Sequence, residues 1–185
     1  HHTPHTLAAP LVLHLLQTVG LPPETVDTLI LGNALGAGGN PARMTALAAG
    51  LPQRCATFSV DTQCCSGLDA INLAAARILS GQSDVVIAGG AEAWTRSPIR
   101  QHRPMDATQA AIPYERPAFT PWPARDPDPL QAAADYAARH GFTRHQQDAY
   151  ARDSHARAVR AMEPRRACTP FSILPLEGLV HDAYP

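Results

Sequence analysis

The sequence has few charged residues, and its charges nearly cancel. Charged side chains make up 17% of the 185 residues, and the formal net charge is −1. A protein that binds nucleic acid or an anionic membrane usually needs an excess of basic side chains. The composition therefore predicts that neither a nucleic acid nor a membrane surface is a partner.

Long hydrophobic runs are also absent. Apolar runs such as residues 29–31 and 85–88 are far shorter than the ~20 residues that a membrane-spanning helix requires. The first residues do not show the charged-then-apolar pattern of a secretory signal. These absences predict a soluble protein of the cytoplasm.

Cysteine is scarce and is not arranged for binding a metal. The four cysteines are Cys55, Cys64, Cys65 and Cys168. They include no C-x-x-C pair, and no cluster of His and Cys has the spacing of a zinc site. The adjacent pair is a poor candidate for a disulfide, because neighbouring Cα atoms lie only ~3.8 Å apart. We expect neither a metal site nor a disulfide framework.

What the chain does have is enough apolar material for one domain with a buried core, since 45% of its residues are hydrophobic. Helical and strand patterns alternate along its first half, which indicates an α/β fold with parallel strands. The expected helices are 7–19, 41–49 and 66–80, and the expected strands are 26–32, 55–60 and 84–88. Asn40 is expected to cap the second helix, with Pro41 as its first residue.

Two of these helices show an apolar stripe. In the first helix, which we expect to lie on a sheet with Pro10 in its first turn, the stripe is Leu7, Leu11, Leu15, Leu16 and Val19. In the third helix the apolar face is Leu68, Ile71, Ala75, Ile78 and Leu79. After Pro98 the pattern changes to a long proline-rich excursion, typical of a lid or a linker. Two further helices follow, 131–140 and 144–161. The second begins with a capping box at Thr143, and Asp148 and Arg152 are expected to form a weak surface pair on it.

The most informative segment runs from Val60 to Ala70 and carries Cys64 from a strand end to the start of a helix. A thiol in that position meets unpaired backbone N–H groups and the positive end of the helix dipole, which favour the thiolate. Cys64 is therefore the candidate nucleophile. The alternative is that Cys64 and Cys65 are two small buried apolar residues, as free cysteines commonly are.

Four segments in order give the chain a resemblance to the thiolase family, which makes or breaks a carbon–carbon bond between acyl-CoA units. They are Val26–Gly32 followed by Asn-Pro-Ala-Arg at 40–43, the Cys64 motif, residues 84–92, and residues 141–155. The resemblance implies that Cys64 is the acylated catalytic residue and that acyl-CoA and coenzyme A are substrates. It implies no bound cofactor, assigns no substrate-binding residue in this chain, and suggests a homodimer or tetramer that acts in fatty acid metabolism.

The resemblance also implies the architecture, which is the N-terminal half of a thiolase-like α/β fold with a mixed sheet and helices on both faces. Residues 1–98 would form the core half and 99–164 a loop region that acts as a lid. Residues 165–185 would return to the core as a strand, with the C-terminal half absent. Asp128-Pro129 stands where thiolases carry a His-Met pair, which leaves the acyl and CoA contacts there open.

Other polar residues have an ordinary structural explanation beside a functional one. Arg43 could serve a subunit interface or be a solvated helix arginine, and the two readings are equally good. Glu92 is better explained as a hydrogen-bonded structural acid near a strand end. His155 is better explained as a surface or packing histidine than as a CoA contact.

Part of the thiolase machinery is missing from the sequence. The family's activating histidine, its second cysteine and its asparagine lie in the second half of the polypeptide, and outside the Cys64 motif no Gly-His-Pro-type or Cys-x-Gly motif occurs here. We therefore expect an acyltransferase chain that has no turnover by itself. Two alternatives stay open, a non-catalytic thiolase-like subunit or scaffold and a decarboxylating condensing enzyme of the ketoacyl-synthase type.

Overall fold

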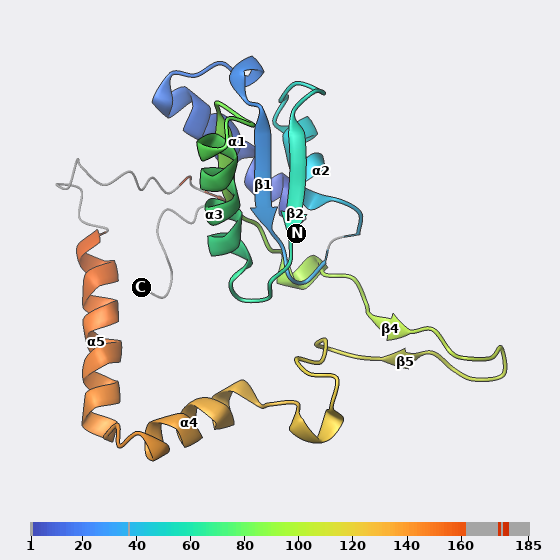
Figure 1. The fold of residues 1–185 in the computed structure, drawn as a ribbon, viewed down its shortest axis with the longest axis vertical. Helices are drawn as coiled ribbons and strands as arrows, with labels where there is room; N and C mark the ends of the chain where they lie inside the picture. The colour runs from blue at the N-terminus through green and yellow to red at the C-terminus, as the bar shows by residue number, and fades with distance from the viewer. Residues whose placement is uncertain (1, 37, 162–173, 175, 178–185) are drawn as a thin grey trace. The chain divides into compact units, whose positions relative to one another are not determined.

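The computed structural model describes residues 2–36, 38–161, 174, 176 and 177 (Figure 1). The chain divides into two compact units, His1–Pro113 and Tyr114–Pro185. The division expected at residues 98 and 164 stays a prediction. The return strand expected within 165–185 lies largely outside the described residues.

Three short parallel strands form the sheet of the first unit. They are β1 (Thr28–Gly32), β2 (Ala56–Val60) and β3 (Val86–Gly90), in the order β2-β1-β3. The central strand β1 pairs with both neighbours, so that Gly32 lies opposite Val60 on one side and Gly90 on the other. The α/β fold class is confirmed. Among the described residues the sheet is parallel rather than mixed, because a helical crossover follows β1 and another follows β2.

Helices cover both faces of this sheet (Figure 1). α1 (Pro4–Val19) and α2 (Pro41–Ala48) pack on one face, and α3 (Ser66–Leu79) packs on the other. Three short 3₁₀ turns and one two-stranded ribbon complete the connections. They are η1 (Pro23–Thr25), η2 (Trp94–Arg96), η3 (Pro123–Arg125), β4 (Gln101–His102) and β5 (Ile112–Pro113).

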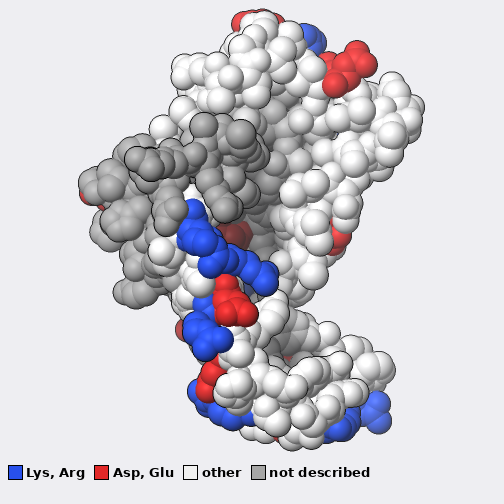
Figure 2. All heavy atoms as spheres, turned by 90° about the vertical axis from the view of Figure 1, so that its left-hand side faces the viewer, with Lys and Arg blue, Asp and Glu red and all other residues white. Residues whose placement is uncertain are grey.

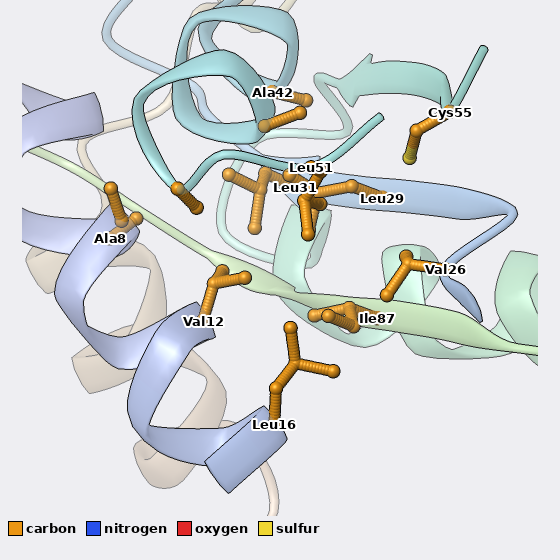
Figure 3. Packing of buried hydrophobic residues seen from close by; sticks show 13 residues of the cluster. Ala8, Val12, Leu16, Val26, Leu29, Leu31, Ala42, Leu51, Cys55 and Ile87 are labelled. Atoms are coloured by element: carbon orange, nitrogen blue, oxygen red, sulfur yellow. The ribbon is translucent and has the colours of Figure 1, made fainter. Parts of the chain in front are cut away.

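The larger core lies between the sheet and the helices α1 and α2 (Figure 3). Leu29 and Leu31 of β1 point into it, and Val12 and Leu16 of α1 meet them from the opposite side. All five residues of β1 are buried, as expected of a central strand with both faces covered. Because neighbouring strand residues point to opposite faces, Ile30 packs instead with Ala70 and Ala74 of α3.

The start of α1 differs from the prediction. The helix begins at Pro4 rather than Leu7, so Pro10 lies in the helix interior and not in the first turn. Pro4 already has the backbone angle that a first helical residue needs, and the Thr6 hydroxyl accepts a hydrogen bond from the Thr3 N–H at 2.9 Å. Gly20 ends the helix in the left-handed conformation, with φ 69°.

The predicted cap of α2 is confirmed. The Asn40 Oδ1 accepts the backbone N–H of Arg43 at 3.1 Å, and Pro41 is the first helical residue. On the same cap the Ser59 hydroxyl donates to Asn40 Oδ1 at 2.7 Å, which ties the helix start to β2. Local capping chemistry was therefore a sufficient guide to this helix.

The apolar stripes predicted for α1 and α3 are mostly exposed rather than turned toward the sheet. Of the α1 stripe, Leu16 is buried, whereas Leu11, Leu15 and Val19 are exposed. In α3 the buried residues are Ser66, Ala70 and Ala74. The bulkier side chains of α3 point away from the sheet, Leu68 being 62% exposed and Leu79 87% exposed. α3 therefore approaches the sheet through small residues, which permit a short distance between backbones.

In its described residues the second unit has two helices, α4 (Pro129–Arg139) and α5 (Arg144–Ala161). The Asp128 carboxylate caps α4 by accepting the N–H groups of Leu130 at 2.8 Å and Gln131 at 3.1 Å. The capping box predicted for α5 is confirmed, since the Gln146 side chain accepts the Thr143 N–H at 2.8 Å. Asp128 thus has a structural role as a helix cap.

Charged side chains are interleaved along α5 (Figure 2). The predicted pair of Asp148 with Arg152 is wrong, because Asp148 pairs with Arg144 at 2.8 Å while Arg152 lies 3.7 Å from Asp153. All four side chains are well exposed, so these pairs add little to stability.

Candidate active site

The three strands of the first unit end side by side, and the turn that carries Cys64 follows one of them. The register places the carboxyl ends of β1, β2 and β3 together at Gly32, Val60 and Gly90. Cys64 lies between the end of β2 and the start of α3. In open α/β sheets, ligands bind at this carboxyl edge.

Glycines allow α3 to begin very close to the sheet. A Cβ atom built on Gly32 would lie 2.6 Å from the Gly67 nitrogen and 2.6 Å from the Ser66 carbonyl carbon. A Cβ on Gly90 would meet the Gly67 Cα at 3.9 Å. The contacts are between backbones, so side chains at Gly32 cannot be accommodated by a change of rotamer. This close approach fixes where the helix starts and therefore where Cys64 lies.

The turn before α3 holds an unusual backbone conformation next to Cys64. Gln63, which directly precedes Cys64, has φ 61°, a left-handed angle that non-glycine residues seldom adopt. The Cys65 N–H donates to the Thr62 carbonyl at 3.3 Å, and the Asp61 carboxylate accepts the Gln63 N–H at 3.0 Å. Such conformations persist only where the surroundings hold them, and they concentrate at functional sites.

Two side chains of α3 reach back to this turn. The Ser66 hydroxyl donates to the Gln63 carbonyl at 2.5 Å and accepts the Thr62 N–H at 2.9 Å. The Thr62 hydroxyl donates to the Asp69 Oδ2 at 2.5 Å. No role for these three residues was predicted from the sequence. A signal was present, since Ser66 and Asp69 form the S-x-x-D pattern that often marks a helix start.

Cys64 and Cys65 are exposed free thiols, whereas Cys55 is buried. The alternative that the adjacent cysteines are two buried apolar residues is therefore wrong. Burial raises the pKa of the Cys55 thiol, against the opposing charge of Arg43, so this thiol stays protonated and shielded. Cys55 can therefore serve as a shielded reference thiol when the reactivities of Cys64 and Cys65 are measured.

Alkylation should separate these thiols. We expect iodoacetamide at neutral pH to modify Cys64 readily and Cys55 at least about tenfold more slowly, because Cys55 is buried and protonated. Peptide mass spectrometry over a time course measures each site. Equal rates at Cys55 and Cys64 in the folded chain would contradict this assignment.

Glu92 organises the backbone after β1. Its Oε1 accepts the Asn33 side-chain amide at 2.5 Å and the Ala34 N–H at 3.0 Å, and its Oε2 accepts the Leu35 N–H at 3.0 Å. The predicted role as a hydrogen-bonded structural acid is confirmed. The carboxylate holds the connection that leaves β1 at the same edge of the sheet as Cys64.

Arg43 also makes a structural contact. Its guanidinium donates to the Cys55 carbonyl at 3.1 Å, so it links α2 to the segment that enters β2. It is therefore not simply a solvated helix arginine, and a role at a subunit interface stays a prediction.

The second unit has a surface hollow of about 350 Å³ at the turn between its helices. It is lined by Phe142, Gln146, Gln147 and Tyr150. The described part of this lining includes neither a cysteine nor a charged side chain. Within the described ranges, no group of three or more His, Cys, Asp or Glu side chains could hold a metal ion. Among all the residues that the structure describes, no helix is long and apolar enough to cross a bilayer.

Residues 1–172 match the family described as thiolase, N-terminal domain. The chain belongs to the thiolase family. Two curated relatives carry the provisional name acetyl-CoA C-acetyltransferase. VraB of Staphylococcus aureus (strain MRSA252) is 37% identical over 157 residues, which cover 84% of this chain and 41% of VraB. YhfS of Bacillus subtilis (strain 168) is 40% identical over 159 residues, which cover 85% of this chain and 39% of YhfS.

A solved thiolase structure has the same fold. The crystal structure of the Bacillus anthracis acetyl-CoA acetyltransferase matches with a TM-score of 0.71 and 34% sequence identity, over 86% of this chain and 42% of that one. This thiolase chain therefore spans about two fifths of the length of the curated relatives it matches. The expected family and the expected resemblance to an N-terminal thiolase half are confirmed.

Proposed function

We propose that this chain carries the nucleophile of a thiolase-type acyltransferase that forms or cleaves 3-ketoacyl-CoA. The observation that supports this most is the exposed Cys64 thiol at the start of α3, at the carboxyl edge of the sheet. Cysteine suits the reaction because it is a strong nucleophile even when partly ionised, and the thioester that it forms keeps an activated carbonyl.

The proposed reaction has two steps. The Cys64 thiolate attacks the carbonyl of an acyl-CoA, the bond from that carbonyl to the CoA sulfur breaks, and CoA leaves as a thiol after taking up a proton. A second acyl-CoA, deprotonated at its α-carbon, then attacks the new thioester. A carbon–carbon bond forms, and the Cys64 sulfur is released. Thiolysis of 3-ketoacyl-CoA is the same sequence reversed.

Each step passes through a tetrahedral centre whose oxyanion needs hydrogen-bond donors, each contributing about 2.7–4 kcal/mol. The Cys64 backbone N–H is one candidate donor. The other donors and the base that removes the α-proton would come from polypeptide that corresponds to the remaining three fifths of the relatives. The outward apolar face of α3 supports this part of the proposal, because a helix that is apolar on both sides is normally covered on both sides.

A short acyl-CoA tests the first step directly. We expect acetyl-CoA to leave one acetyl group on Cys64, detected by peptide mass spectrometry. The Cys64→Ser variant should show no adduct, and the Cys65→Ser variant should still show it. The chain contains no lysine, so the usual side reaction of acetyl-CoA with lysine amines cannot contribute. Thiols that stay unmodified would favour the alternative of a non-catalytic scaffold.

Turnover tests the second step. We expect no thiolysis of acetoacetyl-CoA by these residues alone, because the base and the remaining oxyanion donors are missing. Thiolysis by a preparation of this chain shown by intact mass to contain nothing larger would overturn that expectation. If acylation from malonyl-CoA were preferred over acetyl-CoA, a ketoacyl-synthase type of condensing enzyme would replace the thiolase reaction. A homodimer or tetramer, a cytoplasmic location and a role in fatty acid metabolism complete the proposal.

A further inference from the structure

We propose that Thr62 and Asp69 form a positioning pair that holds the Cys64 turn in its reactive conformation. The pair joins the residue two positions before the nucleophile to the first turn of α3. This inference rests on the proposed role of Cys64. It assigns Thr62 and Asp69 to positioning, since neither is argued to touch the substrate.

Thr62 is fixed by all of its polar groups although its side chain is on the surface. Its N–H donates to the Ser66 hydroxyl at 2.9 Å, and its carbonyl accepts the Cys65 N–H at 3.3 Å. Its hydroxyl donates to the Asp69 carboxylate at 2.5 Å. A bond from a hydroxyl to an ionised carboxylate is among the stronger hydrogen bonds in proteins. Packing of the hydrophobic core does not require an exposed threonine to make three hydrogen bonds, so these bonds indicate a role in holding the turn.

The anchors are needed because the turn stores backbone strain. Gln63 lies between Thr62 and Cys64 with φ 61°. Without restraint, this residue would relax to one of the broad regions that non-glycine residues prefer. Such a rotation would carry the Cys64 sulfur away from the start of α3. Holding Thr62 on one side of Gln63 and Ser66 on the other prevents it.

The pair also restrains an acidic side chain at the start of α3. Asp69 is an acidic residue in the first turn of α3, where the positive end of the helix stabilises a carboxylate. The Thr62 hydroxyl donates a hydrogen bond to Oδ2 of this carboxylate and so fixes its position. Loss of the hydroxyl would thus free the turn that carries Cys64 and deprive the Asp69 carboxylate of this hydrogen-bond donor.

The test compares substitutions of Thr62. We expect Thr62→Val, which removes only the hydroxyl, to slow alkylation of Cys64 by iodoacetamide by about three- to tenfold. Thr62→Ser keeps the hydroxyl and should react within about twofold of the unchanged chain. Thr18→Val is the matched control, because it also removes a threonine hydroxyl that donates a hydrogen bond, at 2.8 Å to the His14 carbonyl, but in α1.

Cys55 reports whether each variant is folded, since its burial shields it from the reagent. If Cys55 of Thr62→Val becomes reactive, Thr62→Ala takes its place. Slower labelling of Cys64 with Cys55 still protected, and recovery in Thr62→Ser, supports the pair. Unchanged labelling of Cys64 in a folded Thr62→Val or Thr62→Ala variant overturns it. A failure of acetyl-CoA to modify the unchanged chain would instead count against the proposed function alone.

Discussion

Replacing Gly32 by alanine should displace the start of α3 and, with it, Cys64. The added Cβ would lie 2.6 Å from two backbone atoms of Ser66 and Gly67, and 2.8 Å from the Ser66 carbonyl oxygen. Backbone atoms cannot avoid this contact by a change of rotamer, so the helix must move. We expect a loss of about 1–3 kcal/mol in the free energy of unfolding, the usual cost of overpacking.

The effect on the nucleophile should be larger than the effect on stability. A displacement of about 1 Å at a catalytic group can reduce a rate by roughly two orders of magnitude. We therefore expect acetylation of Cys64 by acetyl-CoA to become undetectable in Gly32→Ala under conditions where the unchanged chain is modified. Chemical denaturation and peptide mass spectrometry measure the two effects separately.

Gly89→Ala is the matched control. Gly89 lies in β3 next to β1, opposite Leu31, and an added Cβ there has no atom within 4 Å. This variant should keep its stability to within about 1 kcal/mol and keep its acetylation, since alanine also reduces the entropy of the unfolded chain. Equal behaviour of Gly32→Ala and Gly89→Ala would show that close approach at Gly32 does not position Cys64.

Elements whose signals are local could be predicted from the sequence. The Asn40 cap, the capping box at Thr143 and the stop at Gly20 each depend on residues within a few positions of one another. The position of Cys64 between a strand and a helix also followed from the alternation of patterns along the chain. These features need no knowledge of what packs against them.

The contacts that hold the nucleophile turn could not be predicted in the same way. The left-handed angle at Gln63 has no sequence signature, because glutamine is not a residue that favours it. The Thr62–Asp69 hydrogen bond depends on a turn whose path is set by the approach of Gly67 to Gly32. Nothing in the pattern shows that residues 35 positions apart in the chain touch there.

The buried faces of α1 and α3 were missed for a further reason. Both helices are apolar on more than one side, and periodicity selects the bulkier residues. Close packing of α3 on the sheet selects the smaller ones instead, so Ala70 and Ala74 are buried while Leu68 is exposed, and in α1 the buried face includes Leu16 but not Leu11. Which face meets the sheet depends on the distance between backbones, and that distance is a property of the fold.

The burial of the small residues of α3 and the exposure of its bulky ones can be tested by substitution in this chain. Ala70 is fully buried against the sheet and Leu79 is 87% exposed. We expect Ala70→Leu to lower the free energy of unfolding by about 1–3 kcal/mol, because the added carbons must fit between α3 and Ile30. Leu79→Ser should change it by no more than about 0.5 kcal/mol. Denaturant titration measures the change in the free energy of unfolding for both variants, provided that its slope against denaturant concentration is the same as in the unchanged chain.

The same pair of variants bears on what covers α3 in a longer thiolase. Comparable destabilisation by Leu79→Ser and Ala70→Leu in this chain would mean that the outer face is already buried, contrary to the structure. If the outer face is instead an interface for further polypeptide, Leu79→Ser should be harmless here. The corresponding change in a full-length relative should then destabilise that protein by an amount typical of a buried leucine, about 2–5 kcal/mol on truncation.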